Sequence, residues 1–159
     1  LQRRVMTQYG GLDILVCNAS PPIRPLPFIS EKMPQFHEFV HRSLVAVSIP
    51  LSALLAPLSQ KSGWNIVVSS AFVRDLPVEW PHYIAAKSAI EGLVRWASVH
   101  YPLVQGVIVR PPKLLTDQTN TALGRQGAMR VERVAVSIVR GLSAPRLIKE
   151  PQILERFDM

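Results

Sequence analysis

The stretch NIVVSSAFVRDLPVEWPHYIAAKSAIEGLV, residues 65–94, decides the fold of this 159-residue chain. It begins with a short apolar run rich in β-branched side chains, the pattern of a strand buried in a sheet. A loop with Pro77 and Pro81 follows, and a helix begins near His82 and ends before Pro102. Many side chains inside this helix are small, which lets a second helix or a sheet approach closely. Strand, loop and helix in this order form one unit of a parallel α/β sheet.

Strands and helices continue to alternate on both sides of this stretch. Residues 12–17 (LDILVC) are a nearly continuous apolar run, which predicts a strand buried on both faces, and residues 106–109 (GVIV) predict a third strand. Apolar residues at three- and four-residue steps predict helices at residues 1–9, 35–59 and 131–142. Pro50 is expected to kink or split the second of these. This order implies a doubly wound parallel sheet with helices on both faces, a three-layer α/β/α architecture.

Composition favours one compact domain over residues 1–159, without an internal linker. Hydrophobic residues make up 48% of the chain and charged residues 18%, which supplies a core and argues against disorder. The net charge of +7 comes from dispersed Lys and Arg, and no basic run with interleaved aromatics indicates a nucleic-acid groove. We therefore expect no nucleic-acid partner, and basic side chains that help to hold an anionic cofactor or substrate.

Cysteine usage and hydropathy suggest a location. Cys17 is the single cysteine, so an internal disulfide is impossible, and it reads as an inert core thiol. Together with the lack of a secretory signal this favours a reducing compartment, and we expect a cytoplasmic protein. The longest apolar stretch, residues 44–58, falls short of the roughly 20 residues that a membrane span needs. No membrane association is therefore expected.

Ligands of doubly wound sheets bind beyond the carboxyl ends of the strands. In this chain those ends lead into residues 18–20, 69–72 and 110–116, all polar or rich in turn formers. Nearby, Tyr83 and Lys87 are four residues apart at the start of a helix and so share one face. An ammonium beside a phenol favours the phenolate and lowers a pKa that is ordinarily about 10. The pair is a plausible general acid, and the Lys could also hold a ribose hydroxyl.

Ser70 lies at the end of the strand before that helix, thirteen residues before Tyr83. The combined string, from NIVVSSAF to HYIAAKSAIEGLV, closely resembles the active-site segment of the short-chain dehydrogenase/reductase family. Upstream, LDILVCNAS resembles the family's Asn-Asn-Ala-Gly strand exit, with Asn18 and Ala19 matching. Downstream, VIVRPPKLLT resembles its Pro-Gly segment and following Thr, with Pro111 and Thr116 matching. The resemblance runs from residue 12 to about residue 142.

This resemblance implies a partial Rossmann-like fold and an oxidoreductase that transfers hydride between a nicotinamide and a carbonyl or alcohol. Tyr83 would be the general acid/base, Lys87 would lower its pKa and bind the nicotinamide ribose, and Ser70 would polarise the substrate carbonyl. Asn18, Ala19, Pro111 and Thr116 would lie beside the cofactor, which is NADP or NAD, with NADP preferred. Family members commonly dimerise through the two helices predicted here at residues 35–59 and 82–101, so a homo-oligomer is expected.

The sequence also departs from the family pattern. The glycine-rich phosphate loop of the family is absent from these residues. This chain alone is therefore not expected to bind NAD(P) tightly. The resemblance is to the C-terminal, catalytic part of the family. Ser43 stands where spacing places an Asn of the proton relay, and Pro112 replaces a glycine. The tail at residues 147–159 (LIKEPQILERFDM) differs from the usual last strand and is expected to pack on a neighbouring domain or subunit. An alternative function is a non-catalytic or truncated module for docking or oligomerisation, possibly within a ketoreductase-containing synthase.

Other chemically capable residues have simpler interpretations. Three histidines, His37, His41 and His100, lack metal-ligand spacing and are expected at helix surfaces, so no metal site is predicted. His82 is expected to be exposed at the start of its helix. The tryptophans are interpreted as packing residues, with Trp80 a candidate for the wall of a substrate pocket.

Overall fold

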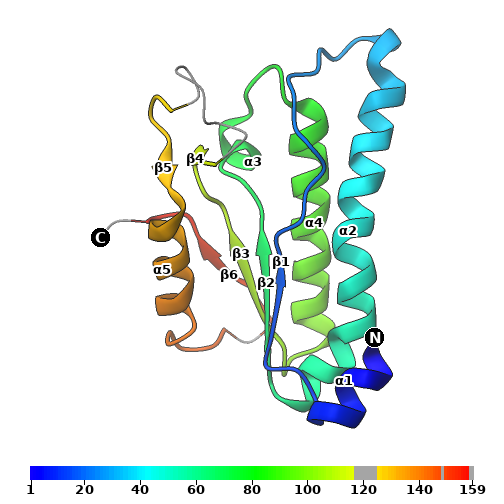
Figure 1. Cartoon of the computed structure of the whole chain (residues 1–159), viewed down its shortest axis with the longest axis vertical. Helices are drawn as coiled ribbons and strands as arrows, with labels where there is room; N and C mark the ends of the chain where they lie inside the picture. Colours follow the sequence, from blue (N-terminus) through cyan, green and yellow to red (C-terminus); the bar gives the residue numbers. More distant parts are fainter. Residues whose placement is uncertain (117–124, 148, 158–159) are drawn as a thin grey trace.

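The computed structural model describes residues 1–116, 125–147 and 149–157. A parallel sheet of four strands lies at its centre, in the order β1 (Ile14–Cys17), β2 (Trp64–Val68), β3 (Gln105–Val109) and β6 (Gln152–Leu154) (Figure 1). Two long helices, α2 (Met33–Gln60) and α4 (Pro81–His100), lie side by side on one face, and α5 (Val131–Gly141) covers the other. The α/β/α fold predicted from the sequence is thereby confirmed.

Shorter elements complete the described chain. The first helix, α1 (Gln2–Tyr9), contacts α2 and ends at Gly10, whose φ of 69° is left-handed and suits glycine. A single 3-10 turn, η1 (Ser30–Lys32), precedes α2, and α3 (Phe72–Asp75) follows β2. Two very short strands, β4 (Leu114–Leu115) and β5 (Met129–Arg130), pair in parallel beyond the end of β3.

Alternating side chains of the central strands divide the core into two layers. Val67 and Ile108 point toward α2 and α4, where they pack with Val47, Ile90 and Val94. The neighbouring positions in the same two strands point to the other face, where they pack with residues of α5 and the tail: Ile66, Val107, Val109, Val134 and Phe157. This alternation is the period of two of a β-strand, and it explains why both strands read as continuous apolar runs.

The structure overturns the expectation about β1 and excludes one of the two alternatives for Pro50 in α2. β1 is not buried on both faces, because it lies at the edge of the described sheet and leaves Ile14 and Val16 exposed. Pro50 does not split α2, which continues through both Pro50 and Pro57 to Gln60. Proline removes one backbone donor from the helix, and packing of α2 against the sheet and α4 compensates for that loss.

The tail is the largest correction. Instead of packing on another domain, residues 152–154 form β6, which pairs in parallel with β3. Phe157 then inserts into the core layer under α5 and is 3% exposed. The tail therefore supplies a strand of this chain's own sheet.

The helix that spans Ser30–Gln60 is long and apolar enough to cross a membrane, judged by length and composition alone. The expectation of no membrane-spanning segment rested on residues 44–58 alone, whereas the helix is about twice as long as that apolar run. A helix that packs in a protein core passes the same test, and α2 contacts β1, β2 and α4, although only 28% of its apolar window is buried.

Candidate active site

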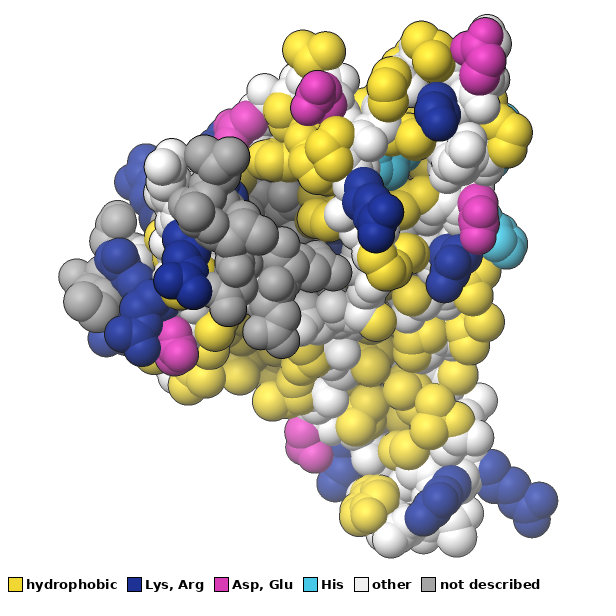
Figure 2. All heavy atoms as spheres, turned by 45° about the horizontal axis from the view of Figure 1, so that its top comes forward, with side chains coloured by type: hydrophobic (Ala, Val, Ile, Leu, Met, Phe, Trp, Pro, Cys, Tyr) yellow, Lys and Arg dark blue, Asp and Glu magenta, His cyan; other side chains and the backbone are white. Residues whose placement is uncertain are grey.

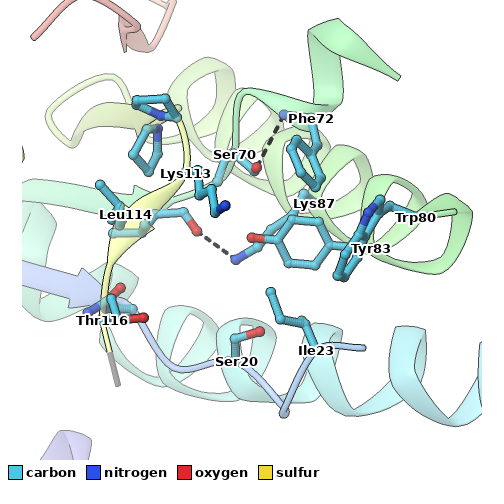
Figure 3. Close-up of a pocket in the computed structure, with 15 residues that line it drawn as sticks. Ser20, Ile23, Ser70, Phe72, Trp80, Tyr83, Lys87, Lys113, Leu114 and Thr116 are labelled. Atoms are coloured by element: carbon cyan, nitrogen blue, oxygen red, sulfur yellow. Dashed lines mark hydrogen bonds between the residues drawn. The ribbon is translucent and has the colours of Figure 1, made fainter. Parts of the chain in front are cut away.

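A pocket of about 560 Å³ opens at the carboxyl end of the sheet (Figure 3). Its walls come from the three strand exits that the sequence singled out, together with the loop before α4 and the first turns of that helix. The lining residues include Asn18, Ser20, Ser69, Ser70, Phe72, Trp80, Tyr83, Lys87, Pro111, Pro112, Lys113, Leu114 and Thr116. The parallel arrangement brings these segments together because all carboxyl ends lie at one edge.

Ser70 follows β2 directly and is 8% exposed. Its Oγ accepts a hydrogen bond of 3.2 Å from the backbone N–H of Phe72, at the start of α3. Because the oxygen is occupied as an acceptor, the hydroxyl hydrogen is free to point at another oxygen. The phenol of Tyr83 is one such group, since a hydrogen bond with Ser70 opposes the rise in the Tyr83 pKa.

Tyr83 and Lys87 occupy successive turns of α4 and face the same pocket (Figure 3). The Lys87 Nζ lies 5.5 Å from the centroid of the Tyr83 ring, a cation–π distance. It donates a hydrogen bond of 2.8 Å to the carbonyl oxygen of Val68, the last residue of β2. This bond ties the helix to the strand that leads into Ser70.

The electrostatics of the pair differ from the sequence-based expectation. Burial lowers the pKa of Lys87 to about 8, since the charged ammonium is removed from water. Burial also raises the pKa of Tyr83, and the hydrogen bond with Ser70 works in the opposite direction. The expected lowering by Lys87 is therefore not found in this structure, because burial governs the pKa of Tyr83 and the opposing effect comes from Ser70. The phenol keeps its proton at neutral pH.

Behind this pair lies a charged network that the sequence analysis missed. Glu91, one turn beyond Lys87, accepts hydrogen bonds from Arg110 at 2.6 and 2.8 Å and from Ser69 at 2.6 Å. Arg110 also contacts Glu155, just after β6. Two signals could have revealed it: Glu91 is on the same helix face as Lys87, and Arg110 follows a fully buried strand, where an unpaired charge is costly.

The residues predicted to lie beside a cofactor divide into two groups. Asn18, Pro111 and Thr116 line the pocket together with Tyr83 and Lys87. Ala19 is exposed and is not among the residues that line it. Ser43, aligned with the family's Asn, is 3% exposed on α2, and its Oγ has no hydrogen-bond partner among the described residues.

Several other predictions are tested by burial. His37, His41 and His100 are exposed, as expected, whereas His82 is only 3% exposed, because it packs on Phe39 of α2 with ring centroids 4.6 Å apart. Cys17 is buried, and burial raises the pKa of its thiol. In the described part of the chain, no three His, Cys, Asp or Glu side chains are grouped so as to hold a metal ion.

Comparison with known proteins identifies the family. Residues 1–125 match the family described as short chain dehydrogenase. The chain belongs to the short-chain dehydrogenase family. This family consists of oxidoreductases, and its assignment agrees with the parallel sheet and with the position of the pocket.

Two relatives illustrate the match to the short-chain dehydrogenases. A fatty acyl-CoA reductase of Acinetobacter baylyi is 25% identical over 130 residues, which are 72% of this chain and 43% of the reductase. The crystal structure of an alcohol dehydrogenase from the archaeon Thermococcus sibiricus, complexed with 5-hydroxy-NADP, superposes with a TM-score of 0.76. That match is 24% identical and covers 96% of this chain and 66% of the dehydrogenase, so it supports the fold. The chain thus spans less than two thirds of either protein.

Proposed function

We propose that this protein is a nicotinamide-dependent oxidoreductase that interconverts a carbonyl compound and an alcohol through Ser70, Tyr83 and Lys87. The observation that carries the proposal is the convergence of these three side chains on one pocket at the carboxyl edge of the sheet. Membership of the short-chain dehydrogenase family supports the reaction type.

The residues present fit the nicotinamide end of such a cofactor. The lining of the pocket offers an amide, a hydroxyl and an ammonium, from Asn18, Thr116 and Lys87, at the place where doubly wound sheets bind nucleotides. Lys87 and Tyr83 would hold the ribose, and Asn18, Pro111 and Thr116 would lie along the nicotinamide. We favour NADP over NAD, and the structural relative complexed with 5-hydroxy-NADP supports a nicotinamide cofactor.

When bound, the nicotinamide supplies or accepts a hydride at the substrate carbon. In the reducing direction Ser70 would donate a hydrogen bond to the carbonyl oxygen and keep its own proton, and Tyr83 would transfer its phenolic proton to that oxygen as the alcohol forms. The phenolate that remains regains a proton from solvent. The raised pKa of Tyr83 suits this direction, because the phenol starts in its protonated form.

Replacing Tyr83 with Phe tests the proposal. Tyr83→Phe keeps the ring but removes the proton donor, so carbonyl-dependent oxidation of NADPH or NADH should fall by about a hundredfold or more. Tyr101→Phe, at the other end of the same helix, is the matched control and should retain activity. Unchanged turnover in Tyr83→Phe, or no binding of either cofactor to the purified full-length protein, would favour the non-catalytic module instead.

We also propose that the protein self-associates through α2 and α4. Several large apolar side chains on these helices are exposed, Ile49, Trp96 and Val99 among them. An added Cβ at Gly92 of α4 would meet no atom within 4 Å, so this part of the helix is open for close approach by a second copy. Members of the family commonly dimerise through the corresponding two helices, and we propose the same arrangement for this protein.

A further inference from the structure

Three aromatic rings form one end of the pocket. Phe72 of α3, Trp80 of the loop before α4 and Tyr83 of α4 contact one another, with centroid separations of 5.7, 6.0 and 6.3 Å. Ile23, from the proline-rich loop after β1, lines the same pocket (Figure 3). These four residues are called the aromatic end below.

The charged side chains among the described lining residues lie away from the aromatic end. Among the described residues that line the pocket, the charged ones are Lys87 and Lys113, and none is acidic. In Figure 3 both ammonium groups lie on the hydroxyl side of Tyr83, whereas Trp80 lies beyond the opposite side of its ring. A charged substituent placed at the aromatic end would therefore lose water without gaining a partner there, which is unfavourable.

The aromatic end is held in place from behind. Trp80 stacks on His82, with ring planes 21° apart, and His82 packs edge-to-face on Phe39 of α2. The backbone N–H of Phe72 donates to the Ser70 Oγ, so this ring is positioned relative to the hydroxyl that would polarise a carbonyl. A surface fixed before binding loses little entropy when a ligand packs on it.

We infer that the substrates are neutral carbonyl compounds or alcohols with an aromatic or bulky apolar group next to the reacting carbon. This inference rests on the proposed function and names its substrate class. With the substrate oxygen at Ser70 and Tyr83, the apolar group packs on Phe72, Trp80 and Ile23. Aromatic rings suit such a site because they combine large apolar area with favourable edge-to-face contacts.

The part of the pocket near Lys87 and Lys113 is less suitable for the apolar group of the substrate. Lys87 is buried, its ammonium bonds to the Val68 carbonyl, and it faces the position proposed for the cofactor ribose. Figure 2 shows Lys and Arg side chains at several separated places on the face around the carboxyl edge, with hydrophobic side chains between them. The aromatic end thus provides the apolar surface that a neutral substrate requires.

The test compares 4-methylacetophenone with 4-acetylbenzoate, which have similar shape but differ in charge, and with dihydroxyacetone, which is small and polar. With NADPH, kcat/KM should be at least tenfold higher for the neutral aryl ketone than for either of the others. Trp80→Leu and Phe72→Leu should each lower that value about tenfold and should lower the value for dihydroxyacetone much less. Tyr9→Leu, which alters an exposed aromatic side chain on α1, away from the pocket, is the control and should change neither.

A second readout separates this inference from the proposed function. Saturation-transfer NMR measures binding of 4-methylacetophenone directly, and the signal should weaken in Trp80→Leu but not in Tyr9→Leu. Reduction of all three ketones without preference, or equal binding by both variants, would overturn the substrate class and leave the oxidoreductase proposal intact. If no ketone is turned over while binding still depends on Trp80, the proposed function fails and the apolar subsite stands.

Discussion

The guanidinium of Arg110 lies 2.6 Å from the carboxylate of Glu91, and this pair joins the end of β3 to the helix that carries Tyr83. Ser69, at the end of β2, donates to the same carboxylate. Arg110 further contacts Glu155 after β6, so that three neighbouring strand ends are linked to α4. The walls of the pocket are therefore fixed relative to one another by charge as well as by packing.

Glu91→Gln should destabilise the fold by about 3 kcal/mol, because it leaves a largely buried guanidinium facing a neutral amide. The side chains of Glu91 and Arg110 are only 5% and 15% exposed. Urea denaturation at neutral pH measures the loss. Glu38→Gln is the matched control, since Glu38 pairs with Arg42 on the exposed surface of α2, and its effect should stay below about 0.5 kcal/mol. Equal losses of stability in the two variants would contradict a stabilising role for the buried pair of Glu91 and Arg110.

The pH dependence of that loss has a definite sign. Burial by itself would raise the pKa of Glu91, but hydrogen bonds from Arg110 and Ser69 outweigh it, so the folded-state pKa is lowered. A carboxylate of this kind stabilises the fold above its unfolded-state pKa, and the contribution disappears as the pH falls through the folded-state value. The difference between wild type and Glu91→Gln should therefore shrink on acidification. If the difference in stability between the two proteins stays constant down to acid pH, the lowered pKa of Glu91 is contradicted.

Lys87 makes stability rise with pH in the alkaline range. Its pKa is about 8 in the folded protein against an ordinary value of 10.5, so between these values the unfolded chain binds more protons and stability rises with pH. Across the whole interval between the two pKa values, the free energy of unfolding should rise by about 3 kcal/mol. Relative to Lys87→Met, which cannot titrate, the wild type should gain stability by roughly that amount from pH 7 to pH 10.5. Parallel stability curves for the two proteins would rule out this burial penalty.

A lysine outside the core provides the control for this measurement. Lys61→Met removes an exposed ammonium just after α2, and its stability curve should run parallel to that of the wild type over the same pH range. The comparison separates burial of Lys87 from the general effect of lowering the net charge.

The order of strands and helices, and the meeting of three strand exits at one pocket, could be predicted because both follow from local patterns. Residues 65–68 and 106–109 have the short apolar runs of buried strands, and Tyr83 and Lys87 share a helix face by spacing alone. Parallel pairing then places the exits at one edge without further information. For the same reason Ser70 was found from its position at the end of a strand.

What the sequence could not reveal depends on neighbours far away along the chain. The strand in the tail has only a short apolar pair, Ile153-Leu154, between Gln152 and Glu155, and it exists because β3 offers an edge to pair with. His82 is buried because Phe39, more than forty residues earlier, packs against it. The pKa of Tyr83 depends on how much water the completed pocket admits, which the spacing of Tyr83 and Lys87 does not specify.

Phe157 gives a direct test of the tail. It is 3% exposed and packs with Ile66, Val107 and Val134, so Phe157→Ala should destabilise the fold by about 3–5 kcal/mol through lost contacts and a cavity. Phe28→Ala is the control, because Phe28 is 67% exposed in the loop before α2. Thermal or urea denaturation of both variants measures the difference. A negligible effect at Phe157 would mean that the tail is not part of the core.

The proposed self-association is tested by placing charge on α2 and α4. Ile49→Glu and Val99→Glu each put a carboxylate on an exposed apolar position, where burial against a second copy would cost several kcal/mol and the free chain would lose little. Light scattering coupled to gel filtration should give a multiple of the chain mass for the wild type and the mass of a single chain for both variants. Val78→Glu, at a 92% exposed position in the loop before α4, should associate like the wild type. A wild-type protein with the mass of one chain would refute the interface, and dissociation by Val78→Glu as well would attribute the effect to charge alone.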